Sequence, residues 1–200
     1  MKALNALFIA VTFFGASAAV QAADTTFAGV TYGQTSDKIK KSGLLDRNTD
    51  HLNTSGIISK DDTWGVRVGQ MNEERRYYLT YDNVSNDHSG LKMRQENLLG
   101  SYDMFYPVGN STKLFGGASA GITKLSQESS GYSRDTDTGY AVGLQAGVLQ
   151  QVTDNTSVEL GYRYLRSNAK TELSEHGGSK VGTLRLDSSA QTYLSANYAF

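Results

Sequence analysis

The chain has 200 residues and is almost electrically neutral, with 19 Lys and Arg residues against 20 Asp and Glu residues and a formal net charge of −1 at pH 7. This balance argues against nucleic acid as a partner, because nucleic-acid-binding domains carry a strongly basic surface. The chain contains no cysteine, which excludes disulfides and thiolate-bound metals.

The first 22 residues predict a cleaved secretory signal peptide. A positively charged start, Met1-Lys2, precedes an almost uncharged apolar stretch at 3–20, and small residues stand at Val20 and Ala22 before the expected cleavage site. A single transmembrane helix is the alternative, but the apolar run is short for one and small residues crowd its end. We therefore expect two parts, a signal peptide at 1–22 and a mature domain at 23–200.

The mature region alternates between apolar and polar residues with a period of two, which predicts β-strands with one apolar and one polar face. No apolar run after residue 22 approaches the length of a membrane helix. The breaks between strands are short at one end of each hairpin and long at the other. The short ones are 72–74, 107–112 and 153–156, and the long polar ones are 36–62, 85–93, 126–138 and 168–180. This spacing predicts about four hairpins, hence about eight strands.

The alternation also predicts which residues face outward. In every predicted strand but one these are even-numbered, including Leu184, Leu186 and Ala190 in the last strand. The exception is the third predicted strand, where Tyr77, Leu79 and Tyr81 face outward. The strand around residues 94–104 is ambiguous. We favour the parity with Leu98, Gly100, Tyr102 and Met104 outward, because it turns Asp103 inward. The opposite parity would place Arg94 and Glu96 inside and expose Asn97 and Asp103.

Charged residues fall mostly on the inward face. A cation facing lipid at mid-depth costs about 2–4 kcal/mol in a membrane barrel, so the charges indicate which face is the interior. A barrel of about eight strands is just wide enough for side chains to fill it, which favours a closed interior over an open pore. A narrow ion pathway is the alternative interpretation of the same charges. The predicted interior ion network is Arg67, Arg76, Asp82, Asp103, Glu159, Arg163, Arg185 and Asp187.

Aromatic residues gather near both ends of the predicted strands, as expected for the two membrane interfaces. A soluble lipocalin-like ligand carrier has the opposite polarity, apolar inside and polar outside, and alternation alone does not distinguish the two. The residues predicted near the short-turn end are Phe27, Tyr77, Phe105, Tyr106, Tyr198 and Phe200, and those near the long-loop end are Tyr32, Trp64, Tyr140 and Tyr164.

The last nine residues, 192–200, alternate strictly and end on an aromatic carboxy-terminus, Phe200. In this they resemble the final strand of bacterial outer-membrane β-barrels. Together with the signal peptide and the hairpin plan, the whole chain resembles small outer-membrane barrels of the OmpX/Ail/Lom type and the transmembrane domain of OmpA. The resemblance implies an eight-stranded antiparallel transmembrane β-barrel in the cell outer membrane, monomeric and in contact with lipopolysaccharide. It also implies that Leu194, Tyr198 and Phe200 form a C-terminal signal read by the barrel-assembly machinery.

The resemblance further implies a role in envelope integrity, adhesion or interaction with a host or cell-surface partner through the loops. No catalytic motif accompanies it, and we expect no enzyme activity. Small barrels that deacylate lipid A carry a His-x-Ser pair, which none of His51, His88 and His176 matches. No metal-ligand spacing and no nucleotide-binding loop appears, so we expect no metal and no cofactor.

The first polar segment carries the most suggestive surface residues. Lys38, Lys40 and Lys41 cluster there and could meet the phosphates of lipopolysaccharide or a protein partner. The alternative is a mixed-charge, solvated surface or strand extensions that project above the membrane, because the same segment also carries several Asp residues.

Overall fold

The computed structural model describes residues 24–41, 57–88, 91–129, 132–174 and 180–200. Within these ranges it leaves out the side chains at the strand ends, at 39–41, 57–59, 85–88, 91–93, 127–129, 132–135, 170–174 and 180–185. The predicted signal peptide at 1–22 lies outside the described residues and stays a prediction. The described residues include no helix long and apolar enough to cross a membrane.

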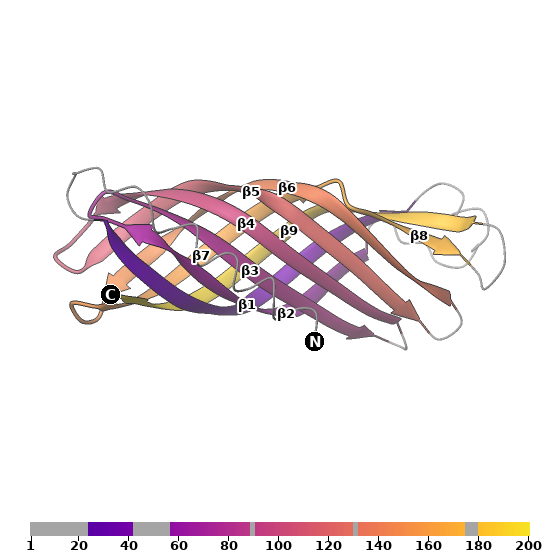
Figure 1. Cartoon of the computed structure of the whole chain (residues 1–200), viewed down its shortest axis with the longest axis horizontal. Helices are drawn as coiled ribbons and strands as arrows, with labels where there is room; N and C mark the ends of the chain where they lie inside the picture. Colours follow the sequence, from indigo (N-terminus) through magenta and orange to yellow (C-terminus); the bar gives the residue numbers. More distant parts are fainter. Residues whose placement is uncertain (1–23, 42–56, 89–90, 130–131, 175–179) are drawn as a thin grey trace.

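Within the described residues, nine strands form a single antiparallel sheet that closes on itself through the pairing of β1 with β9 (Figure 1). Both β7 and the short β8 pair with β9, so they occupy one position in the sheet, and the barrel has the predicted eight strands. The strands are β1 (Thr25–Lys41), β2 (Ile57–Met71), β3 (Arg75–His88), β4 (Leu91–Pro107), β5 (Thr112–Ser129), β6 (Tyr132–Gln151), β7 (Thr156–Ser167), β8 (Lys170–Ser174) and β9 (Lys180–Ala199).

Short turns join the strands at one end of the barrel. The side-chain oxygen of Asn72 accepts hydrogen bonds from the backbone N–H groups of Glu74 and Arg75, each at 2.9 Å, and the hydroxyl of Thr153 accepts one from Thr156 at 3.0 Å. Such side-chain bonds replace backbone pairing within a tight turn. The residue types at 72 and 153 therefore specify where these hairpins reverse.

At the opposite end of the barrel, the connections between strands are shorter than the polar segments predicted from the sequence. The sheet continues through much of 36–62, because β1 extends to Lys41 and β2 begins at Ile57. Most of 85–93 and 126–138 is likewise strand. These extensions escape prediction because a strand that stands clear of lipid has water on its outer face and does not need apolar alternation. Figure 1 shows β8 and the facing part of β9 projecting beyond the rest of the barrel at this end.

The polarity of the two faces is that of a membrane barrel. Large apolar side chains cover the outer face, among them Leu144, Leu194 and Val30, each at least 60% exposed. The interior contains buried Arg, Asp, Glu, Gln and Thr side chains. This arrangement is the reverse of a lipocalin, so the soluble-carrier alternative is wrong. In β4, Met104 is 65% exposed and Asp103 is fully buried, which settles the ambiguous parity in favour of even-numbered residues outward.

A β-bulge changes the predicted faces near the outer end of β9. The partners of Lys38 and Ile39 are Ser188 and Leu186, so Asp187 has no partner on β1 and the alternation shifts there. Leu186 was expected to face lipid but is 2% exposed, and Asp187 was expected inside but is partly exposed. A bulge adds one residue to one strand, which reverses the side that every following residue faces.

Aromatic rings fill the short-turn end of the interior. Phe115, Leu149 and Tyr193 form a buried cluster against which Phe105 packs. Phe27 is fully buried, with its ring edge-on to Tyr78 at a centroid distance of 5.9 Å. The assignment of Phe27 and Phe105 to the membrane interface is therefore wrong. Both stand at odd-numbered positions on strands whose even-numbered residues face outward, so parity decides their side rather than residue type.

We expect the space above Gly161 to be essential for this packing. A Cβ atom added at Gly161 would overlap Cζ of Tyr193 and lie 2.5 Å from its hydroxyl oxygen, so Gly161→Ala must displace the ring. Overpacking of this kind costs about 1–3 kcal/mol. The matched control is Gly116→Ala, because a Cβ atom there has no neighbour within 4 Å. Urea titration of the barrel in lipid vesicles should show a lower midpoint for Gly161→Ala alone, and equal midpoints would contradict this packing.

Candidate functional site

Arg76 on β3 is the centre of the interior ion network. Its Nε donates to Asp103 Oδ2 at 2.7 Å, and its Nη1 and Nη2 donate to the two carboxylate oxygens of Glu159 at 2.6 and 3.1 Å. Arg67 on β2 donates to the same Glu159 at 2.9 Å. All four side chains are fully buried. Because β3 and β7 are not neighbours in the sheet, the Arg76–Glu159 pair crosses the barrel interior.

Neutral side chains supply further hydrogen bonds to the carboxylates of Glu159 and Asp103. Glu159 also accepts a hydrogen bond from the Tyr193 hydroxyl at 3.0 Å. Asp103 accepts from the Tyr78 hydroxyl at 3.1 Å and from the Gln145 amide at 2.5 Å. Charge-assisted bonds of this kind strengthen in a low-dielectric interior. Each carboxylate is thus held by an arginine and by at least one neutral donor.

A third arginine extends the network toward the outer end. Arg163 on β7 donates from Nη1 to Asp82 on β3 at 2.7 Å and from Nε to the Gln145 side-chain oxygen at 3.0 Å. Gln145 therefore joins the Arg163–Asp82 pair to the Asp103 end of the network, which we did not predict from the sequence. Its inward parity on β6 was the available signal, but an uncharged side chain gives no clue to its partner.

The guanidinium groups also lie over aromatic rings. Arg76 lies 4.6 Å from the Phe115 ring centroid and 4.9 Å from that of Tyr78. Arg67 and Arg163 lie 5.3 and 5.5 Å from the ring of Tyr193. Cation–π contacts add roughly 2 kcal/mol when both groups are desolvated. The rings therefore stabilise the arginines as well as filling the barrel.

The structure brings together six of the eight residues predicted for this network: Arg67, Arg76, Asp82, Asp103, Glu159 and Arg163. It does not bring Asp187 to them, because the bulge in β9 turns that residue to the outer face. The side chain of Arg185 lies outside the described residues. Among the described side chains, no group of three or more His, Cys, Asp or Glu residues could hold a metal ion.

A second group of charges lies on the outer face at the long-loop end. Glu96 on β4 pairs with Arg94 at 3.2 Å and with Lys124 on β5 at 3.5 Å, and it accepts a hydrogen bond from the Tyr81 hydroxyl at 2.6 Å. Both cations remain about half exposed. Lys38 on β1 is also exposed, whereas the side chains of Lys40 and Lys41 lie outside the described residues. We call the exposed, outward-facing cations of this end the outer-rim cations: Lys38, Lys60, Arg94, Lys124 and Arg166.

The C-terminal residues lie on the lipid-facing surface. Leu194, Tyr198 and Phe200 are 62%, 57% and 68% exposed. The backbone N–H of Phe200 donates to Thr26 on β1 at 2.9 Å, so the end of the chain lies at the seam that closes the barrel. Recognition of these residues by the assembly machinery stays a prediction.

Comparison with solved structures places the fold among outer-membrane barrels. Outer membrane protein H (OprH) from P. aeruginosa is 56% identical, with 89% of this chain and 100% of that chain covered and a TM-score of 0.58. Neisserial surface protein A is 17% identical over 86% of this chain and 97% of that chain, with a TM-score of 0.63. Ail of Yersinia pestis is 12% identical over 87% and 98%, with a TM-score of 0.51. No protein-family model and no curated protein matches the chain. The predicted fold and outer-membrane location are confirmed.

We expect the interior network to depend on Glu159. Glu159→Gln removes the charge that Arg67 and Arg76 share, leaving two buried cations with too few carboxylates, at a cost of about 3–5 kcal/mol. The matched control is Glu96→Gln, because its partners Arg94 and Lys124 are about half exposed and ion pairs open to solvent contribute about 0–1 kcal/mol. Urea midpoints in lipid vesicles measure both. A similar, small shift for the two variants would contradict the central role of Glu159.

Stability of the outer end should depend on pH through Asp37, which lies above the aromatic residues Tyr32 and Trp64. Burial raises the pKa of Asp37 from 3.8 to about 6, opposed by a hydrogen bond from Ser189 and supported by nearby Asp61. Because the folded-state pKa is raised, the stabilisation is complete below about pH 4 and is lost as pH rises through 6, by up to about 3 kcal/mol.

Hydrogen exchange of the outer β1 amides at pH 4.5 and 7.5 measures this dependence. After correction for the intrinsic exchange rate, the wild-type amides should be less protected at pH 7.5 than at pH 4.5. In Asp37→Asn the protection of these amides should be the same at the two pH values. Asp62→Asn, at an exposed position on β2, is the control and should retain the wild-type dependence. An unchanged pH dependence in Asp37→Asn would assign the effect to another group.

Proposed function

The chain belongs to the outer-membrane barrel family of outer membrane protein H, and we propose that it is a non-enzymatic envelope protein whose outer rim binds the phosphates of lipopolysaccharide. The observation that carries this proposal is the position of the outer-rim cations. They come from β1, β2, β4, β5 and β7, so they surround most of the barrel. Lys124 and Arg166 are the next outward residues after Ile122 and Tyr164, and Lys38, Lys60 and Arg94 lie further along the outer ends of their strands.

Charge balance supports a phosphate ligand. Among the described side chains on the outer face at this end, the five outer-rim cations outnumber the carboxylates Asp62, Glu96 and Asp187. The side chains of Arg94 and Lys124 are 57% and 49% exposed even though each pairs with Glu96. An exposed pair of this kind is weak, so an anion of higher charge can compete for the cations. Several cations at the level of the lipid headgroups attract anionic lipid more strongly than any one of them.

The interior supports a role that does not involve transport. The buried arginines at membrane depth are matched by buried carboxylates, and aromatic rings occupy the short-turn end. A barrel of this size filled by side chains leaves the outer face and the two ends as the surfaces that meet other molecules. This is the basis for favouring an envelope function over a pore and over catalysis within the barrel.

Neutralising the outer-rim cations tests the proposal. The variant Lys38→Gln/Lys60→Gln/Arg94→Gln/Lys124→Gln/Arg166→Gln should bind purified lipopolysaccharide at least 10-fold more weakly in detergent micelles, and wild-type binding should weaken as salt increases. The matched control is Arg75→Gln, which removes an exposed cation at the opposite end of the barrel. Folding of the five-site variant is checked by the change in its gel mobility on boiling. If the folded variant binds lipopolysaccharide as tightly as the wild-type protein, lipopolysaccharide binding at this rim is refuted.

A further inference from the structure

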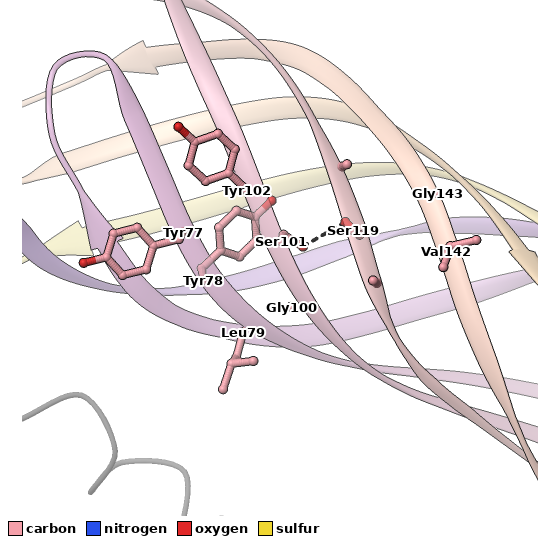
Figure 2. Close-up of a pocket in the computed structure, with 11 residues that line it drawn as sticks. Tyr77, Tyr78, Leu79, Gly100, Ser101, Tyr102, Ser119, Val142 and Gly143 are labelled. Atoms are coloured by element: carbon pink, nitrogen blue, oxygen red, sulfur yellow. Dashed lines mark hydrogen bonds between the residues drawn. The ribbon is translucent and has the colours of Figure 1, made fainter.

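A groove of about 610 Å³ crosses the outer face of β3, β4, β5 and β6 (Figure 2). Figure 2 shows Tyr77, Tyr102, Leu79 and Val142 arranged around it, with Gly100 between them. Because these outward residues belong to the apolar band of the barrel, the groove opens to the hydrocarbon of the membrane.

Small residues produce the groove. Its floor is formed by Gly100, Ala118 and Ala120, where neighbouring outward positions carry long side chains such as Leu144, 69% exposed, and Met104, 65% exposed. A Cβ atom at Gly100 would meet only the Ala120 carbonyl oxygen at 3.7 Å and a Leu79 methyl at 3.9 Å, so unused space lies directly above the backbone. Water is scarce at this depth, so hydrocarbon must fill the space for its lining atoms to keep their van der Waals contacts.

The groove runs from the short-turn end toward the membrane centre. The residues Leu79, Gly100, Ala120 and Val142 are successive partners in one row across the four strands. Leu79 lies near the beginning of β3, close to the short turn, whereas Val142 lies in the middle of β6. In barrels of this kind the short turns are periplasmic. The row therefore follows the course of an acyl chain that begins at the periplasmic interface.

Charged groups stand at the periplasmic end of this row. Arg75 precedes Tyr77 and Leu79 at two-residue spacing on β3, so it shares their outward face, and it is exposed. Its guanidinium makes no ion pair among the described residues, in contrast to Lys113, which pairs with Glu73 at 2.5 Å. The Asp24 carboxylate lies at the same end, where it accepts hydrogen bonds from the Tyr77 hydroxyl at 3.3 Å and from the Asn72 amide at 2.8 Å. A cation and a carboxylate that both neighbour Tyr77 match the phosphate and the ammonium group of a zwitterionic lipid.

We propose that this groove is a specific site for one zwitterionic phospholipid of the phosphatidylethanolamine class in the periplasmic leaflet. One acyl chain lies along Leu79, Gly100, Ala120 and Val142. The lipid phosphate contacts Arg75, and its ammonium group contacts Asp24. This site lies at the opposite end of the barrel from the outer-rim cations, so it goes beyond the proposed function and does not depend on it.

Filling the groove tests the acyl-chain site. Ala120→Leu places a large side chain on its floor, and the matched control is Ala196→Leu, an identical change at an exposed, lipid-facing position on β9. Each barrel is reconstituted into nanodiscs of equal parts phosphatidylethanolamine and phosphatidylglycerol, transferred to mild detergent and analysed by native mass spectrometry. We expect the wild-type protein and Ala196→Leu to retain one phospholipid, and Ala120→Leu to retain at least 10-fold less. Equal retention in Ala120→Leu and Ala196→Leu would refute the site.

The headgroup contact is tested in the same samples. The lipid retained by the wild-type protein should be phosphatidylethanolamine in clear excess over phosphatidylglycerol, and Arg75→Gln should reduce its retention several-fold. If the retained lipid contains phosphatidylethanolamine and phosphatidylglycerol in the same equal parts as the nanodisc, the headgroup assignment is wrong. The five-site outer-rim variant is expected to keep its phospholipid, so failure of this site and failure of lipopolysaccharide binding are separate results.

Nuclear Overhauser effects identify what occupies the groove. The sample is a deuterated protein with protonated Ala methyl groups, placed in a bilayer whose acyl chains are protonated. The methyl groups of Ala118 and Ala120 should show stronger cross-peaks to the acyl-chain methylenes than the methyl group of Ala196 does. Equal cross-peaks would indicate ordinary surrounding lipid and refute a specific site. Chemical cross-linking between barrels through this face, lost in Ala120→Leu, would identify a second copy of the chain as the occupant and likewise refute it.

Discussion

The pairing of Arg76 with Glu159 and Asp103 is the interaction on which the rest of the barrel depends. Asp103 is the cross-strand partner of Arg76 on the neighbouring strand β4, whereas Glu159 lies on β7 across the barrel. All three are buried at membrane depth, where an uncompensated charge costs several kcal/mol. Arg76 and Glu159 meet only when the sheet closes through β1 and β9. Closure and charge compensation are therefore one event. An open sheet would leave arginines without carboxylates and strand edges without partners.

A filled interior directs function to the outer face and the ends. The two ends also differ in charge. The outer-rim cations surround most of the long-loop end, whereas the exposed Arg75 at the short-turn end directly follows Glu73 and Glu74. One barrel can thus contact a polyanionic lipid in one leaflet and a zwitterionic lipid in the other. Both contacts would help hold the barrel at a defined depth.

Small residues have opposite effects on the two faces of this single-layer sheet. On the inside, Gly161 leaves room for the ring of Tyr193, which in turn donates to Glu159. On the outside, Gly100 and Ala120 leave a groove that the protein itself does not fill. Inward space is taken up by the chain's own aromatic rings, while outward space is available to the membrane. A glycine's parity therefore decides whether it serves packing or an external contact.

The sequence by itself determined the fold class, the number of strands and the inward position of charges such as Arg76 and Asp103, because lipid penalises an outward charge and two-residue alternation is a local property. Only the tertiary structure decided which charges pair, since Arg76 and Glu159 are separated by 83 residues and meet across the barrel. It also reversed Leu186 and Asp187, because a bulge depends on the register between two strands and is not encoded in the alternation of one strand. The inward position of Phe27 and Phe105, in contrast, follows from the parity of their strands, and residue type alone is misleading there because an aromatic ring is tolerated on either face.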